Sequence, residues 1–341
     1  MNELYNKMKY FEDVEKISAR IYYHYTSVDA LYEIVKTRTF RLTSLKSSND
    51  KRELFYKAEQ FLSELNAICE QEQHENTKKY FECVKESIDQ NYDKFISQFK
   101  AKRFPYALCL SEKKDNLTHW DRYASGCAGV CIGFNVSALT VYLERSASVS
   151  FGIGLYDIGK VVYSAEDRKK YIRENLIKFF NMMYEKEANK VEKEKFKELI
   201  LKNSYIYAAS VALQLAKFAK TDSFVDEDEI RLYHDTASIK STLNLIDSMS
   251  PQIDEVLHRN VRNNFKDVTR NLKLDKEDFC MTQRGIRGYK NLYLGGVWES
   301  GVIPEIILGP TCVQNCNELK RFLKANGLEG TKVKVSEVPI R

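Results

Sequence analysis

The clearest pattern of apolar and polar positions lies near the start of the chain. Residues 20–26 place three tyrosines in a short apolar run, which is typical of a half-buried strand. Residues 27–37 then repeat apolar side chains at helical spacing, and Thr26 and Asp29 have the spacing of a capping box. The pattern therefore predicts a strand with His24 at its end, followed at once by a helix. Side chains at such junctions are exposed and rigidly placed, as chemistry requires.

The same two periodicities predict the remaining elements. Short apolar or alternating runs predict strands over 40–43, 104–111, 129–134, 160–164, 229–233, 289–297, 305–308 and 332–339. Helical spacing predicts helices over 1–19, 53–72, 77–99, 117–124, 166–219, 236–275 and 313–326. Strands and helices follow one another without a regular strand–helix–strand rhythm, which predicts an α+β fold rather than a doubly wound sheet.

The chain is expected to form a single domain over residues 1–341. It has 5 prolines and 14 glycines, and no Pro-, Gly- or Ser-rich linker interrupts it. Several predicted helices arrive in pairs, as insertions do. We therefore expect the core strands within 20–54, 101–165, 221–235 and 285–312, and helical insertions over 53–100, 166–220 and 236–275.

Charge and cysteine content narrow the class of protein. The net charge of +5, from 53 basic and 48 acidic residues, permits an anionic ligand and does not demand nucleic acid. No secretory signal and no apolar run of membrane-spanning length is present, so we expect no membrane association. The eight cysteines lack the spacing of a zinc site, and Cys109 and Cys131 lie in apolar runs as buried thiols do. These features predict a cytoplasmic protein without a bound metal.

Polar residues beside the first strand are the first candidate site. His24 can bind a nucleotide, with the hydroxyls of Thr26 and Ser27 near a ribose or an amide. The alternative is a hydrogen-bonded histidine beside an ordinary helix cap. Asn49, Asp50 and Glu53 can reach the same cleft, although helix capping also explains them.

Two aromatic residues on a short helix are the second candidate. Trp120 and Tyr123 lie three residues apart and can stack on a planar ring, with Ser111 hydrogen-bonding a ligand amide. Aromatic residues at this spacing also occur as ordinary core residues. His119 beside them is either an acid–base catalyst or a surface residue.

A carboxylate on a late strand is the third candidate. Alternation places Glu229 and Arg231 on one strand face, where the carboxylate can hold a ribose hydroxyl and stabilise a developing cation. The alternative is a solvent-facing ion pair on an edge strand. The acidic run 226–229, together with Asp50, is also compatible with the metal site of a nuclease or phosphodiesterase. The run lacks the spacing and the glycine of an EF-hand.

Several short motifs, taken together in order, resemble a large bacterial family of unknown function. They are Tyr23-His24-Tyr25-Thr26-Ser27, Arg41-Leu42-Thr43-Ser44, Asn49-Asp50-x-x-Glu53, Cys109-x-Ser111, Asp115-x-Leu117-x-x-Trp120-x-x-Tyr123, Gly129-Val130-x-Ile132-Gly133-Phe134, Phe218-x-Lys220-x-x-x-Phe224, Glu227-x-Glu229-x-Arg231 and Glu305-Ile306-Ile307-x-Gly309-Pro310. The family in turn resembles the ADP-ribosyltransferase superfamily and, more loosely, its DNA- and RNA-modifying toxins. The resemblance implies two small mixed sheets around a cleft that binds NAD.

The resemblance also implies roles for individual residues. His24 would hydrogen-bond the nicotinamide ribose, Thr26 and Ser27 would lie on the nicotinamide side, Tyr25 would contact NAD through its backbone, and Glu229 would activate the ribose. Tyr25 replaces the glycine that many members of the superfamily have after the histidine. The residue that stacks on nicotinamide would be Tyr123, with Trp120 as the second choice.

The resemblance also implies a residue that binds the pyrophosphate of NAD, and this residue would be either Arg41 or Arg231. The function expected from the resemblance is ADP-ribosyl transfer from NAD to a macromolecular acceptor, either nucleic acid or protein, as in a toxin or an anti-phage defence effector. A sensor module that binds a nucleotide without turnover is an alternative, and so is the metal-dependent nuclease.

Overall fold

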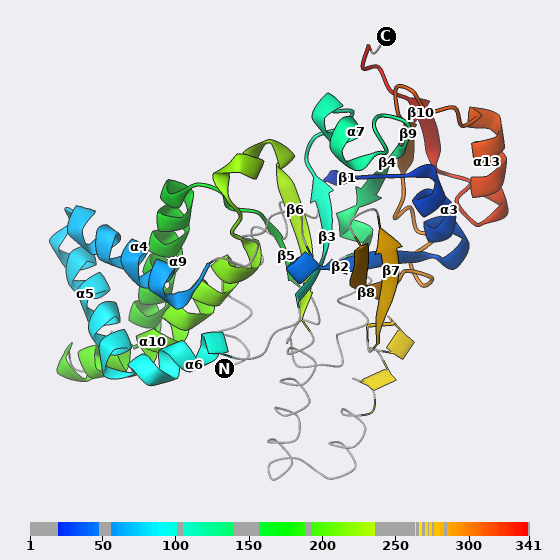
Figure 1. The fold of residues 1–341 in the computed structure, drawn as a ribbon. Coiled ribbons are helices and arrows are strands. Elements are labelled where there is room, and N and C mark those ends of the chain that lie inside the picture. Colours follow the sequence, from blue (N-terminus) through cyan, green and yellow to red (C-terminus); the bar gives the residue numbers. More distant parts are fainter. Residues whose placement is uncertain are drawn as a thin grey trace.

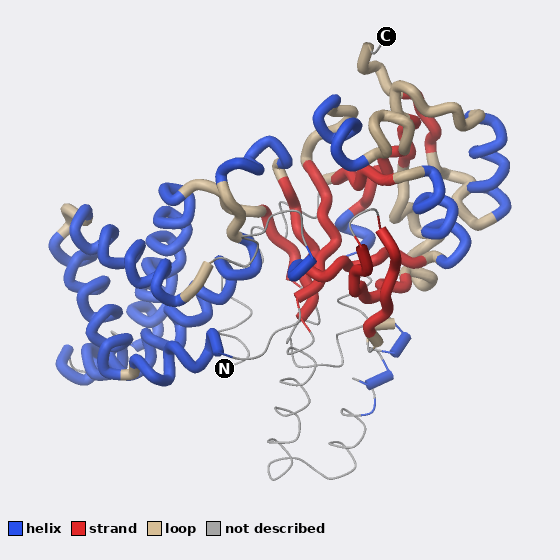
Figure 2. Tube along the Cα trace, in the orientation of Figure 1, coloured by secondary structure: helices blue, strands red, loops and turns tan. Residues whose placement is uncertain are grey.

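The computed structural model describes residues 20–47, 56–100, 105–139, 157–187, 193–235, 277–282 and 285–339, with scattered positions between 263 and 276. Strands gather in the centre of the molecule, and a bundle of helices lies to one side of them (Figures 1 and 2). Within the described residues, no helix is both long enough and apolar enough to cross a bilayer.

The strands of the described residues are β1 (Ile21–Thr26), β2 (Thr39–Ser44), β3 (Pro105–Ser111), β4 (Val130–Asn135), β5 (Asp157–Lys160), β6 (Glu229–Asp235), β7 (Glu277–Thr282), β8 (Gly285–Tyr293), β9 (Glu305–Leu308) and β10 (Lys332–Val335). The α-helices are α3 (Val28–Thr37), α4 (Ala58–Gln71), α5 (Glu75–Gln90), α6 (Tyr92–Lys100), α7 (Leu117–Tyr123), α9 (Ala165–Glu187), α10 (Lys193–Phe218) and α13 (Cys316–Ala325). Two short 3₁₀ helices, η1 (Leu45–Ser47) and η2 (Asp222–Glu227), follow β2 and α10.

The described strands form one mixed sheet that branches at β3. The order along its main path is β10-β9-β4-β1-β3-β2-β8-β7, and β6 adds to β3 and carries β5. The β9–β10 pair is parallel, whereas β3 runs antiparallel to β1, β2 and β6. The sequence-based α+β assignment is therefore confirmed. The described strands form one sheet rather than the two small sheets that were expected, because β3 pairs with β1, β2 and β6.

The branch at β3 opens the sheet. β6 pairs with β3 along its whole length, whereas β1 meets β3 at Ser111 and β2 meets it at Tyr106 and Ala107. β1 and β2 therefore diverge along the middle of β3. In that gap a side chain replaces a strand partner, because Nδ1 of His24 lies 3.0 Å from the carbonyl oxygen of Cys109.

The hydrophobic interior forms separate clusters beside and within the sheet. One joins the sheet to α3 and α13, where the rings of Tyr32 and Phe322 stack 5.3 Å apart. Another lies inside the bundle of α4, α5, α6, α9 and α10. In that bundle Nε of Arg168 donates to Glu64 at 2.8 Å, and both side chains are buried. The predicted helical insertions thus surround a core of their own.

Close backbone packing fixes the end of β4 against β1 and β9. A Cβ atom at Gly129 would lie 2.2 Å from the carbonyl oxygen of Thr26, and one at Gly309 would lie 2.3 Å from that of Cys127. No side chain fits at either position. These two glycines therefore set the distance between the strand that carries His24 and its neighbours.

Several predicted boundaries require correction. The cap of α3 is Ser27, whose hydroxyl accepts from the N–H of Ala30, because Thr26 is still paired with Val130 in the sheet. The helix predicted over 77–99 divides at Asn91 into α5 and α6. The helix predicted from residue 53 begins at Ala58 in the described part of the chain.

Four strands also differ from expectation, and one of them, β10, ends at Val335 rather than at residue 339. β5 lies at 157–160 rather than 160–164, and β8 ends at Tyr293, four residues early. β7 was missed, because the strand is short and largely exposed, with Phe279 and Met281 reaching solvent rather than a core. The predicted helices over 1–19 and most of 236–275, and the polar turn with Asn49, Asp50 and Glu53, lie outside the described residues.

Candidate functional site

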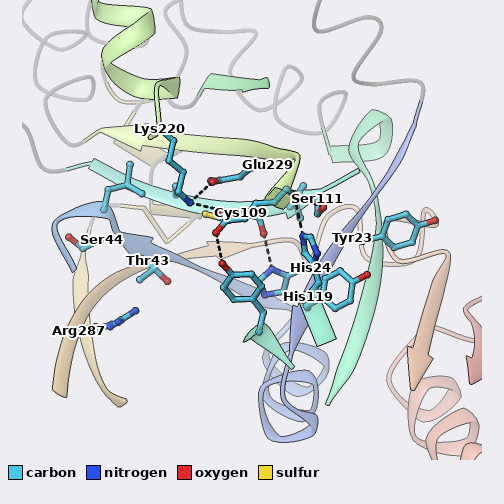
Figure 3. A pocket seen from close by; sticks show the side chains of 16 residues that line it. Tyr23, His24, Thr43, Ser44, Cys109, Ser111, His119, Lys220, Glu229 and Arg287 are labelled. Carbon is cyan, nitrogen blue, oxygen red and sulfur yellow. Dashed lines mark hydrogen bonds and ion pairs between the residues drawn. The ribbon is translucent and has the colours of Figure 1, made fainter. Parts of the chain in front are cut away.

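A cavity of about 260 Å³ occupies the place where β1 and β2 separate along β3. Strands β1, β2, β3, β6 and β8, helix α7 and the segment after α10 all contribute to it (Figure 3). Its lining residues are Tyr23, His24, Tyr25, Thr43, Ser44, Leu45, Ala107, Cys109, Leu110, Ser111, His119, Tyr123, Lys220, Glu227, Glu229 and Arg287. Residues more than 250 positions apart in the sequence thus line the same cavity.

His24 is held at the floor of the cavity by its hydrogen bond to the carbonyl oxygen of Cys109. A carbonyl only accepts, so Nδ1 carries the proton and Nε2 is left as an acceptor. Burial lowers the pKa of His24 below its ordinary value, although the bond to Cys109 partly opposes this. His24 is therefore a neutral imidazole with one acceptor nitrogen at physiological pH.

Cys109 itself faces the cavity. Its side chain is open to the cavity although protein encloses it on the other sides, so the prediction of a buried thiol among leucines is wrong for this residue. Strand alternation explains the error, since Leu108 and Leu110 point to the opposite face and enter the core. Burial raises the pKa of the Cys109 thiol well above its ordinary value, and the Glu229 carboxylate raises it further. The thiol is therefore protonated and a weak nucleophile.

Glu229 is buried and held by two cations. Nε of Arg231 donates to its Oε1 at 2.9 Å, and Nζ of Lys220 donates to its Oε2 at 3.0 Å. Burial alone would raise the pKa of Glu229, but Arg231 and Lys220 more than offset it and hold the pKa well below its ordinary value. The carboxylate is therefore ionised throughout the physiological range.

Glu227 lies beside Glu229 and shares Lys220 with it. Its Oε2 accepts from Nζ of Lys220 at 2.5 Å, and its Oε1 accepts from the hydroxyl of Tyr123. Asp228, between the two glutamates, adopts a left-handed conformation with φ of 41°. This local reversal at the end of η2 lets Glu227 and Glu229 face one cation, while Asp228 turns toward Lys113 at 3.4 Å.

Helix α7 is fixed to β1 through Tyr25. The hydroxyl of Tyr25 donates to the carbonyl oxygen of Lys113 at 2.8 Å and accepts from the N–H of Asn116 at 2.9 Å. Asn116 is also the cap of α7, since its Oδ1 accepts from the N–H of His119. Tyr25 therefore places the start of α7, and with it Tyr123, relative to the strand that carries His24.

His119 is a buried residue rather than the surface residue that one interpretation expected. It is 3% exposed, and its ring nitrogens lie 2.9 Å from Oδ1 of Asn116 and 3.2 Å from the carbonyl oxygen of Glu227. Burial lowers the pKa of His119, while the Glu227 carbonyl opposes the shift. The imidazole therefore links α7 to the carboxylate segment.

Six of the candidate residues meet in the cavity, namely His24, Tyr25, Ser111, His119, Tyr123 and Glu229. The hydroxyl of Ser111 already donates to the Glu227 carbonyl at 2.7 Å and accepts from the N–H of Lys113, so it supports the wall. The edge-strand interpretation of Glu229 is wrong, because β6 lies between β3 and β5 and all its positions are buried.

The other predicted residues lie elsewhere. The hydroxyl of Ser27 caps α3, and Thr26 is in the sheet. Trp120 is fully buried, with its Nε1 donating to Asp115 at 2.7 Å, so it belongs to the core beneath α7. Arg41 is exposed and lies over the ring of Tyr289, 4.8 Å from its centre.

Arg231 is 1% exposed and lies behind Glu229, with Nη1 donating to the carbonyl oxygen of Lys217. Its role is therefore to hold Glu229 rather than to line the cavity. Arg287 is an arginine that does line the cavity, on the side of Thr43 and Ser44 (Figure 3).

Sequence reasoning assigned no role to Lys220, Thr43, Ser44 or Arg287, and it considered Glu227 only as part of a metal-binding acidic run. Lys220 and Glu227 lie within the quoted motifs, and the pairing of glutamates two positions apart was a usable signal. The acidic run does not gather around one point, because Asp228 turns to Lys113 while its neighbours bind Lys220. Within the described part of the chain, no cluster of three or more His, Cys, Asp or Glu residues has the geometry of a metal site.

Comparison with known proteins places part of this site within a recognised domain. Residues 119–232 match the model of a family described as a protein of unknown function (DUF2971). The match begins at His119 on α7 and ends at Leu232 on β6, so it includes Tyr123, Lys220 and Glu229. No curated protein and no solved structure matches the chain. The chain thus carries a DUF2971 domain, a domain of unknown function, over residues 119–232.

Proposed function

We propose that this protein transfers ADP-ribose from NAD to an acceptor. The observation that carries the proposal is that His24 from β1 and Glu229 from β6 line one cavity although they are some 200 positions apart in the sequence. A neutral imidazole and a permanently ionised carboxylate around a single small cavity suit a sugar with two hydroxyls and a developing positive charge.

The nicotinamide ribose is the part of NAD that this cavity suits. Its volume of about 260 Å³ is below the range of roughly 300–1,000 Å³ typical of sites that enclose a whole drug-sized ligand. Nε2 of His24 accepts from one ribose hydroxyl and the Glu229 carboxylate accepts from another. The ring of Tyr123 offers an aromatic face to nicotinamide, since Trp120 is buried in the core.

The pyrophosphate of NAD would lie toward Arg287, Thr43 and Ser44. Arg287 is a cavity-lining cation away from the carboxylates, whereas Arg231 lies behind Glu229 and Arg41 packs on Tyr289. A guanidinium binds phosphate oxygens in a bidentate manner, with hydroxyl donors beside it.

In the reaction, the bond between C1′ of the ribose and the nicotinamide nitrogen breaks, and the electron pair leaves with nicotinamide. The ribose then carries positive charge, which the Glu229 carboxylate stabilises. A pKa far below neutrality makes Glu229 a poor general base, so its contribution is electrostatic. The acceptor forms the new bond to C1′ and loses a proton.

Nicotinamide release from labelled NAD tests this proposal. We expect release by the wild-type protein, and a decrease of about 10²–10³-fold in Glu229→Gln, as for the loss of one electrostatic contact to a transition state. Glu112→Gln is the matched control, because Glu112 forms a more exposed pair with Lys160 outside the cavity.

Equal release by the wild-type protein and Glu229→Gln would remove Glu229 from the mechanism. Tight NAD binding without release, across protein and nucleic-acid acceptors, would favour the sensor module instead. Modification of a protein or nucleic acid by the active protein would in turn support the role of a toxin or defence effector.

A further inference from the structure

Lys220 occupies an unusual position for a lysine, between the two glutamates of the cavity. Its Nζ lies 2.5 Å from Oε2 of Glu227 and 3.0 Å from Oε2 of Glu229, and the residue is 6% exposed (Figure 3). Lysine is rarely buried to this extent unless it is paired. The pair of carboxylates therefore requires this cation, and the cation requires the pair.

The structure around Lys220 holds it in place. Its backbone N–H donates to the carbonyl oxygen of Val162 at 3.0 Å, just after α10 ends at Phe218. Its ammonium group also lies 4.7 Å from the centre of the Phe224 ring, within the range of a cation–π contact. The ammonium is therefore fixed by the backbone, an aromatic ring and two carboxylates together.

The negative charge of both cavity carboxylates is already matched by buried cations, Lys220 and Arg231, although each carboxylate oxygen can still accept from a hydroxyl. Glu227 accepts from Tyr123 and Lys220, and Glu229 accepts from Arg231 and Lys220. A guanidinium or ammonium acceptor needs a carboxylate to neutralise and orient it. Such a group would meet the ammonium of Lys220 at the place where it needs an anion, and like charges at close range in a buried site repel strongly.

We infer that Lys220 determines the class of acceptor, which is an uncharged nucleophile such as a hydroxyl rather than a guanidinium or ammonium group. This inference rests on the proposed function. The acceptor oxygen bonds to C1′ as nicotinamide leaves with the bonding electron pair, and the hydroxyl proton passes to solvent water or to the Glu227 carboxylate. A hydroxyl needs one acceptor and brings no charge, so it is compatible with carboxylates whose negative charge is already matched by Lys220 and Arg231.

The experiment compares a cationic with an uncharged small acceptor. Wild type, Lys220→Met and Lys217→Met are incubated with NAD and either agmatine, which carries a guanidinium, or methanol. Lys217→Met is the matched control, because Lys217 lies in the last turn of α10, close in sequence to Lys220, but pairs with Asp157 outside the cavity. Products are separated by mass spectrometry and expressed per nicotinamide released.

We expect wild type and Lys217→Met to form ADP-ribose and its methyl derivative but no agmatine adduct. Lys220→Met should form the agmatine adduct in an amount at least about tenfold above the background signal of the wild-type reaction. This ratio is expected when one charge-assisted hydrogen bond becomes available. An agmatine adduct formed efficiently by wild type would overturn the inference. So would a Lys220→Met protein that releases nicotinamide and gains no adduct.

A binding measurement covers the case in which Lys220→Met is inactive. Calorimetry with agmatine, in the presence of ADP-ribose, should detect binding to Lys220→Met and none to wild type. Absence of that gain overturns the inference whatever the activity. If wild type releases no nicotinamide, the proposed transferase function fails, while the gain of agmatine binding still reports whether Lys220 excludes cations.

Discussion

Replacing Arg231 by lysine tests how Glu229 is held. Arg231 is 1% exposed, and its contacts with described residues include three directed ones: Nε to Oε1 of Glu229 at 2.9 Å, Nη2 to Oε2 at 3.3 Å, and Nη1 to the Lys217 carbonyl oxygen at 2.9 Å. Lysine keeps the charge but has a single nitrogen, so it loses the fork geometry. Two of the three contacts should be lost.

The expected magnitude follows from burial. Breaking a buried ion pair costs about 3–5 kcal/mol, and hydrogen bonds to charged groups are worth about 1.5–3 kcal/mol each. Because lysine retains one contact to Glu229, we expect Arg231→Lys to lower the free energy of unfolding by about 3 kcal/mol, near the lower limit for a broken pair.

Arg173→Lys is the matched control for this change. Arg173 also donates through Nε and Nη2 to one glutamate, Glu72, at 3.0 and 2.7 Å, but its side chain is 43% exposed. Its loss of stability should be smaller, because the Arg173 guanidinium reaches solvent, although the Glu72 side chain is only 4% exposed. The two experiments therefore differ mainly in burial.

Urea denaturation at pH 7, followed by circular dichroism, measures both variants. Tryptophan fluorescence adds a probe of the sheet, since Trp120 and Trp298 both lie in clusters on the sheet side. A loss in Arg231→Lys no greater than that in Arg173→Lys would refute the reasoning, because Arg231 would then behave as a solvent-facing partner.

Three further predictions concern the walls of the cavity. Tyr25→Phe should cost about 1–2 kcal/mol and raise the KM for NAD, because the hydroxyl that fixes the start of α7 is lost; denaturation and steady-state nicotinamide release measure these effects. The pKa values of His24 and His119 are lowered by folding, so the unfolded chain binds more protons below a pH of about 6.5, and stability should fall as the pH decreases from 7.5 to 5.5. Replacing both histidines by glutamine should flatten that decrease. Nicotinamide release should be unchanged by EDTA, whereas a metal-dependent nuclease or phosphodiesterase would lose activity.

Local sequence patterns were sufficient for the elements that carry the site. The tyrosine-rich run and the helical spacing after it predicted β1 and α3 nearly to the residue. Alternation also put Glu229 and Arg231 on one face of β6, where they form an ion pair. These are short-range features, in which the period of the side chains decides the outcome.

Contacts between distant segments could not be predicted in this way. The burial of Glu229 depends on β3 and β5 pairing with the two edges of β6. The local pattern of residues 229–235 predicts neither pairing. For the same reason the local pattern could not show that Trp120 is fully buried whereas Tyr123 reaches the cavity.

Lys220 shows most clearly what was missing. In the sequence it is one lysine among many near the end of a long helix. Its role depends on the left-handed turn at Asp228, which brings Glu227 and Glu229 to the same side. Backbone conformations of this kind at residues other than glycine are set by the surrounding structure rather than by local propensity.

A crystal structure of Glu229→Gln with bound NAD tests the central claim most directly, because the variant should bind the dinucleotide and turn it over slowly. The account predicts nicotinamide ribose in the cavity, with one hydroxyl within hydrogen-bond distance of Nε2 of His24, another at residue 229, and the pyrophosphate at Arg287. Density for the dinucleotide outside this cavity, or with its adenine end against His24, would contradict the account.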